Sequence, residues 1–169
     1  MAEGFETRFE ANYPDILRLA RARLSREQSP ISTVTLAHEL YLNLRDRDNL
    51  KFASAAEFMA YASRAMRSLL VDMARERMAQ KRSAELMPLT LGADVPDLGG
   101  TPEQLVALDE ALTRLGNVES RLMRVAELRV IMGLEVTEIA ASLGISEPTV
   151  KRDWQRAKAF LHEALGVPP

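Results

Sequence analysis

The sequence predicts an all-α protein made of two small helical domains. Ala, Leu, Arg, Glu and Met are abundant, whereas aromatic residues form only 5% of the chain, and this balance favours helices over strands. Apolar residues recur at helical spacing on both sides of a stretch that is rich in glycine and proline. At 169 residues with 47% hydrophobic content, the chain is large enough for one ordinary domain or two small ones.

Three helices are expected in the N-terminal half, at about residues 6–24, 32–45 and 55–80. The third is long and has two faces. One is an apolar stripe formed by Phe58, Ala62, Ala65, Leu69 and Met73. Roughly opposite this stripe lies a row of arginines, which are Arg64, Arg67, Arg75 and Arg82. Such a row is often only a solvated face, but here it also suggests phosphate binding.

The loop before this helix, residues 46–54, strengthens the nucleic-acid interpretation. It contains Asn49, Lys51 and Phe52, a polar, basic and aromatic mixture that can hold and stack an unpaired base. Phe58 and Tyr61 are further candidates for such stacking, although core packing is the expected role of both because Phe58 lies on the apolar stripe.

Residues 83–101 are expected to be a flexible acidic linker between two domains, at 1–82 and 102–169. The segment contains Pro88, Pro96 and three glycines, has no basic residue and shows no helical period. After it, helices are expected at about 102–115 and 118–132.

The stretch from 134 to 161 predicts a helix-turn-helix. Val136, Ile139, Ala140 and Leu143 form the apolar side of a short helix, which Gly144 ends. A second helix then restarts with a capping serine, an acidic residue in the first turn and an early proline. These three residues are Ser146, Glu147 and Pro148.

The second helix of this motif has a polar face suited to a DNA major groove. Its apolar side consists of Val150, Trp154, Ala157 and Leu161, so the polar side chains must point elsewhere. With the residues at the start of the helix, the candidate DNA contacts are Ser146, Thr149, Lys151, Arg152, Gln155 and Arg156. A plain helical hairpin with a solvated face is the alternative.

Other classes of function have little support in the sequence. The chain has no cysteine and only two histidines, His38 and His162, and it lacks a glycine-rich phosphate loop and a spaced carboxylate cluster. We therefore expect no catalytic site, metal or cofactor. No stretch reaches the length of a membrane span and the start does not resemble a signal peptide, so a soluble, cytoplasmic protein is expected.

Read end to end, the chain resembles the extracytoplasmic-function (ECF) sigma factors, the small two-domain subunits that bring bacterial RNA polymerase to promoters. The most specific segments are LAHELYLNL (36–44), ASRAMRSLLVDMAR (62–75) and TVKRDWQRAKAFL (149–161). The resemblance covers nearly the whole chain. It implies two partners, promoter DNA and core RNA polymerase, the latter bound through its flap and the clamp helices of its largest subunit.

The resemblance also implies roles for individual residues. Residues 32–45 would dock on the polymerase clamp, with His38, Glu39 and Asn43 as contacts. The minus-ten promoter element would be bound by Asn49, Lys51, Phe52, Arg64, Arg67 and Arg75. The C-terminal polar face would read the minus-thirty-five element, and the acidic linker would thread through the polymerase between the domains.

One departure from the family pattern concerns regulation. Most members carry carboxylates at the positions of Ser32, Thr33, Val34 and Thr35, whereas this chain has three hydroxyl residues among these four. A phosphoryl group there would add about −1.5 to −2 charge at a helix start, which favours anions. Activation by a Ser/Thr kinase is therefore one hypothesis. Simple capping by Ser32 and Thr35 is the alternative, and control by an anti-sigma factor stays open.

Two further interpretations of the whole chain remain. A repressor or activator would bind palindromic duplex sites as a dimer and would use the N-terminal helices for dimerisation or ligand sensing. A helical adaptor without a nucleic-acid role would leave the arginine row and the polar helix face unexplained.

Overall fold

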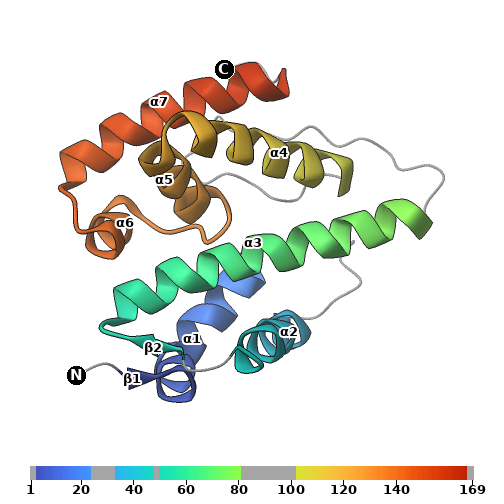
Figure 1. The fold of residues 1–169 in the computed structure, drawn as a ribbon, viewed down its shortest axis with the longest axis vertical. Helices are drawn as coiled ribbons and strands as arrows, with labels where there is room; N and C mark the ends of the chain where they lie inside the picture. Colours follow the sequence, from blue (N-terminus) through green and yellow to red (C-terminus); the bar gives the residue numbers. More distant parts are fainter. Residues whose placement is uncertain (1–2, 24–32, 48–49, 81–101, 167–169) are drawn as a thin grey trace.

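A computed structural model of the chain describes residues 3–23, 33–47, 50–80 and 102–166. These residues form seven helices and one pair of two-residue strands (Figure 1), which confirms the predicted all-α class. The elements in chain order are β1 (Glu3–Gly4), α1 (Phe5–Arg23), α2 (Thr33–Arg45), β2 (Lys51–Phe52), α3 (Ala55–Gln80), α4 (Pro102–Val118), α5 (Ser120–Val130), α6 (Val136–Leu143) and α7 (Glu147–Leu165). The predicted linker, 83–101, lies outside the described residues.

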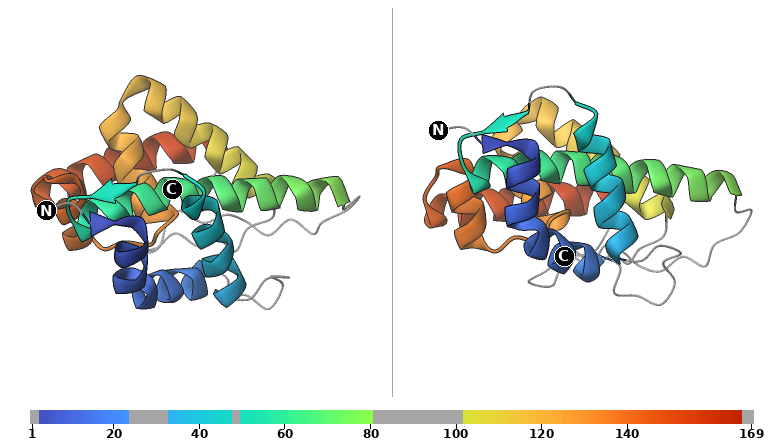
Figure 2. Two further views of the ribbon diagram at one scale, coloured as in Figure 1. Left: turned by 60° about the horizontal axis from the view of Figure 1, so that its bottom comes forward. Right: turned by 90° about the horizontal axis from the view of Figure 1, so that it is seen from below.

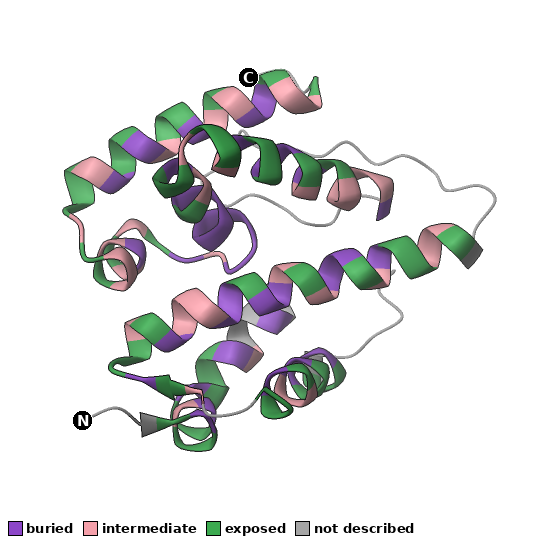
Figure 3. Cartoon of the chain, in the orientation of Figure 1, coloured by how far each residue is buried: buried purple, intermediate pink, exposed green. Residues whose placement is uncertain are grey.

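The long helix α3 lies in the middle of the molecule (Figures 1 and 2). Helices α1 and α2 pack on one side of it, and α4, α5 and α6 pack on the other. The last helix, α7, packs on α4, α5 and α6. Both sides of α3 are therefore covered, as the run of buried and half-buried residues along it shows in Figure 3.

Aromatic side chains fill the core between α3 and the N-terminal helices. Phe58 of α3 is fully buried, and its ring meets those of Phe9 and Phe52 edge-on, with centroids 6.3 and 5.3 Å apart. Burying such a side chain contributes about 1.5–3 kcal/mol, and edge-to-face pairs add to it. The expected core role of Phe58 is confirmed.

A second core joins α4, α5 and α7 through Leu108, Leu112, Leu122 and Leu161, each at most 4% exposed. The first core does not stop at α3, however. The same apolar cluster that holds Phe58 continues to Leu128, Ile139 and Val150 in the C-terminal half. The two halves are thus packed against each other. The predicted domain boundaries remain a prediction.

Two local features differ from the sequence expectations. Residues 3–4 and 51–52 pair as an antiparallel ladder, with Glu3 opposite Phe52 and Gly4 opposite Lys51, where only a loop was expected. Two-residue strands are too short to show an alternating pattern. Helix α4 also continues through Gly116 to Val118, and the helix ends before Glu119, whose backbone is extended at φ −150°. A Cβ at Gly116 would lie 3.3 Å from Met123, so the glycine permits close packing of α5 on α4.

The predicted helix-turn-helix is present with its expected turn residues. Gly144 ends α6 in the left-handed conformation, at φ 65° and ψ 35°. Ser146 then caps α7, because its side chain accepts a hydrogen bond from the backbone N–H of Thr149 at 3.3 Å. The left-handed glycine and the serine cap together fix the angle between the two helices.

Replacing Gly144 with alanine is expected to lower the free energy of unfolding by about 1–2 kcal/mol, because a Cβ is disfavoured in the left-handed conformation. The added methyl would meet no atom within 4 Å, so backbone strain is the sole cause. Urea denaturation measures the change. Gly4→Ala is the matched control, since that position is equally open and its φ is not positive. Equal effects of the two substitutions would contradict the argument.

Candidate nucleic-acid interface

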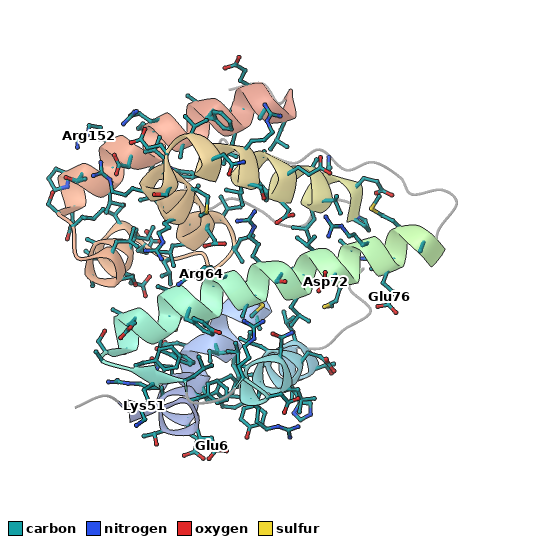
Figure 4. All side chains as sticks on the ribbon, viewed as in Figure 1. Glu6, Lys51, Arg64, Asp72, Glu76 and Arg152 are labelled. Atoms are coloured by element: carbon teal, nitrogen blue, oxygen red, sulfur yellow. The ribbon has the colours of Figure 1, made fainter. Side chains whose placement is uncertain are left out.

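The polar face of α7 is open to solvent. Lys151, Arg152, Gln155 and Arg156 are all exposed, and Figure 4 shows Arg152 projecting away from the body of the protein. The opposite side of the helix is anchored, since Val150, Ala157 and Leu161 are fully buried. Ser146 is exposed and Thr149 is half-buried at the start of the helix. The structure therefore brings the six predicted C-terminal residues together along one helix.

An ion pair that the sequence did not predict holds α7 in place. Asp153 is fully buried, and both of its carboxylate oxygens accept hydrogen bonds from Arg121 of α5. This hydrogen bonding raises the pKa of Arg121 above its ordinary value. A bidentate pair of this kind fixes geometry as well as charge. Asp153 thus orients the helix whose exposed face carries Arg152.

Arg156 differs from its neighbours on the polar face. Its guanidinium donates to both carboxylate oxygens of Glu119, at 2.8 and 3.3 Å. Within the described part of the chain, Lys151 and Arg152 form no ion pair. Two cations on this face are therefore available to an incoming anion, whereas Arg156 would have to leave Glu119.

The arginine row on α3 is not a free cationic face. Arg67 is only 12% exposed and donates from Nε to the Asp109 carboxylate at 2.7 Å and from Nη1 to the Glu127 carboxylate at 3.2 Å. Its Nη2 donates to the Asp109 carbonyl and the Thr113 hydroxyl, both at 2.9 Å. The expectation of a solvated row is thus wrong for Arg67, because α4 and α5 cover this side of α3.

Glu127, the partner of Arg67 on α5, is itself buried. Its side chain is only 4% exposed, and this desolvation raises the pKa of Glu127, while the nearby positive charge of Arg67 opposes the rise. A carboxylate in such a place needs a cation beside it. Arg67 and Glu127 therefore depend on each other.

Arg64 and Arg75 lie at the rim of the same contact. They line a hollow of about 310 Å³ between α3, α4 and α5, together with Ser68, Asp72 and Asp109. The Arg64 guanidinium lies 5.8 Å from the centroid of the Tyr61 ring, and Arg75 lies 4.0 Å from the Asp109 carboxylate. Both arginines are exposed. Arg82 lies outside the described residues.

The loop before α3 places its predicted residues in different environments. Lys51 is exposed in β2, whereas Phe52 is only 3% exposed and packs against Phe58 and Tyr61. In this conformation Phe52 does not present its ring to a base. Tyr61 is half-buried, and its hydroxyl accepts a hydrogen bond from Arg47 at 3.1 Å, a partner that the sequence did not indicate. Asn49 lies outside the described residues.

The outer face of α2 carries the predicted polymerase contacts. His38, Glu39 and Asn43 are exposed, while the inner face is buried through Leu36, Leu40 and Leu44. Thr35 is exposed on the same helix, and Val34 is 60% exposed. Thr33 is the first residue of α2, and Ser32 lies outside the described residues.

Within the part of the chain that the structure describes, no group of three or more His, Cys, Asp or Glu residues is arranged to hold a metal ion. None of the described helices combines the length and apolar character that a membrane crossing requires.

A comparison with protein families matches residues 2–167 to the family described as ECF sigma factor. No curated protein and no solved structure matches the chain. The family match covers the outer face of α2, the arginine row and the helix-turn-helix.

Asp153→Ala is expected to lower the free energy of unfolding by about 1–3 kcal/mol, because it removes the hydrogen bonds that the buried carboxylate accepts and opens a gap at a fully buried site. Urea denaturation measures this loss. Glu163→Ala, at an exposed position of the same helix, is the control and should change stability by less than about 0.5 kcal/mol. A similar small change for Asp153→Ala would show that the pair does not hold α7.

Proposed function

Because the chain belongs to the ECF sigma factor family, we propose that its two halves divide the work of promoter selection. Members of this family are non-enzymatic initiation factors that bind core RNA polymerase and promoter DNA. In this proposal the N-terminal half binds the polymerase and the minus-ten element, and the C-terminal half reads the minus-thirty-five element. The family match over residues 2–167 is the observation that carries the proposal.

Helix α7 is the proposed reader of the minus-thirty-five element. Its exposed Lys151, Arg152 and Gln155 offer the side-chain donors that recognise base edges and phosphates in a major groove. Ser146 and Thr149 at its start would contact the DNA backbone, and Arg156 would join them after releasing Glu119. Each well-made bidentate contact contributes about 1–3 kcal/mol of discrimination between bases.

The outer face of α2 is the proposed polymerase contact. His38, Glu39 and Asn43 are exposed there over a buried apolar stripe, so the helix can dock without losing its packing on α1 and α3. The clamp helices of the largest subunit are the expected partner, and the flap is the expected partner of the C-terminal half. For the minus-ten element, the proposed contacts are Asn49, Lys51, Phe52, Arg64, Arg67 and Arg75.

A phosphoryl switch at the start of α2 is a finer part of the proposal. The first turn of α2 contains no acidic residue, although a helix N-terminus favours negative charge. Phosphorylation of Ser32, Thr33 or Thr35 would supply about −1.5 to −2 charge there. The added charge would attract the basic clamp helices, so a Ser/Thr kinase is the proposed regulator and an anti-sigma factor is the alternative.

The first experiment measures binding of the purified chain to core RNA polymerase and transcription from promoters selected by that complex. Glu39→Ala is expected to weaken polymerase binding, because it removes a docking charge. A double Arg152→Ala and Gln155→Ala variant should keep polymerase affinity but reduce transcription at least tenfold, since two base or phosphate contacts are lost. Ala159→Ser, at an exposed position of α7, is the control.

Two outcomes of this experiment would contradict the proposal. If the chain fails to bind polymerase but binds palindromic duplex DNA as a dimer, it is a repressor or activator. If the double variant keeps both polymerase binding and full transcription from the selected promoters, α7 is not the reader.

For the switch, Thr35→Asp is expected to raise polymerase affinity several-fold, because it places a permanent negative charge in the first turn of α2. Polymerase binding of the untreated chain, of the chain treated with ATP and a cell extract, and of each variant measures the effect. Combined alanine replacement of Ser32, Thr33 and Thr35 should abolish any response to the extract. A response that survives these replacements would remove these hydroxyls from the mechanism.

A further inference from the structure

The contact around Arg67 joins the two halves of the chain through charge. Arg67 belongs to the helix proposed to bind the minus-ten element, and its partners Asp109, Thr113 and Glu127 belong to α4 and α5. We call these four residues the Arg67 clasp. The three partners lie 42 to 60 residues after Arg67 in the sequence, so the clasp exists only when the two halves are packed together.

The clasp uses the donors that a phosphate would need. All three guanidinium nitrogens of Arg67 donate to oxygens of α4 and α5, at 2.7 to 3.2 Å. Two of these oxygens belong to carboxylates, which, like phosphate oxygens, are anionic acceptors for an arginine fork. Because the donors are occupied and the side chain is only 12% exposed, Arg67 cannot bind carboxylate and DNA at the same time.

Apolar packing beside the clasp favours the same closed arrangement. The cluster that includes Met66 and Leu70 of α3 continues into Leu128 and Ile131 of the C-terminal half. This apolar packing is non-directional, whereas the hydrogen bonds of the clasp require specific partners in a specific geometry. The burial of Glu127 also makes its charge dependent on Arg67.

We infer that Asp109 and Glu127 act as an internal competitor of promoter DNA: in the free chain they occupy Arg67, and the halves must separate before α3 can bind a nucleic-acid backbone. This inference rests on the proposed role of α3 in DNA binding. It places the polar face of α7 outside the closed contact, because Lys151, Arg152 and Gln155 stay exposed on that helix. Closure therefore withholds Arg67 while the polar face of α7 stays open.

The test uses the full chain, which contains no cysteine. Glu10→Cys in α1 and Ala159→Cys in α7, both exposed, accept a donor and an acceptor dye, so energy transfer reports whether the halves are together. Asp109→Ala is expected to increase the open population about tenfold, as the loss of a charge-assisted hydrogen bond predicts. Glu110→Ala removes the same charge from the exposed neighbour on α4 and should leave energy transfer unchanged.

A second measurement uses a single-stranded oligonucleotide of random sequence as the probe, because a phosphate contact does not depend on sequence. Asp109→Ala should bind it several-fold more tightly than Glu110→Ala at the same ionic strength. Arg67→Ala should also open the halves but should not gain affinity. If the alanine variant at 109 does not fold, Asp109→Asn, which keeps the shape of the side chain, takes its place.

The two measurements separate the inference from the proposed function. Equal energy transfer and equal oligonucleotide affinity for the variants at 109 and 110 would overturn the clasp. A different result is that Asp109→Ala opens the halves although the chain neither binds polymerase nor directs transcription. The clasp would then be only a structural contact, and both its competitor role and the proposed function would be overturned.

Discussion

The structure depends on α3 being buried from two sides. A helix covered on one side only can leave its charged residues in water, but a helix covered on both must pair any charge that faces a neighbour. Arg67 faces α4 and α5, and its partners Asp109 and Glu127 meet this requirement. Removing either side of such a pair leaves a poorly solvated charge, so the packing of the halves and the ion pairs support each other.

This arrangement gives the two proposed DNA-binding surfaces different accessibility in the same conformation. The polar face of α7 points away from α3, and Arg152 is exposed. The arginine row lies partly inside the contact, where Arg67 is bound and Arg64 and Arg75 remain at the rim. A closed chain can therefore offer its proposed minus-thirty-five reader while Arg67 is withheld. In this proposal the packing of the two halves would set the order in which the two surfaces meet a promoter.

The sequence predicted local features well and long-range features poorly. Gly144 and Ser146 were identifiable because a helix end and a helix cap depend on nearby backbone groups, and both are confirmed. The arginine row was recognised from its spacing, but its partners were not. Asp109 and Glu127 lie 42 and 60 residues from Arg67, and no local pattern encodes such a pairing. The contacts of Phe52 with Phe58 and Tyr61 were missed for the same reason, since they depend on a short strand pair without a sequence pattern.

The two proposed regulatory mechanisms, the phosphoryl switch and the Arg67 clasp, act on opposite sides of α3. Helix α2 packs on α1 and α3 and, within the described residues, does not contact α4 or α5, so a phosphoryl group near Thr35 would not touch the Arg67 clasp. Sites that share no partners usually contribute additively to a free energy. A charge on α2 would then change the affinity for polymerase, while the clasp would set the fraction of chains with α3 available. The amount of competent complex depends on the product of the polymerase affinity and the fraction of open chains. Each mechanism can therefore change that amount strongly, even if it does not act as a complete on–off switch.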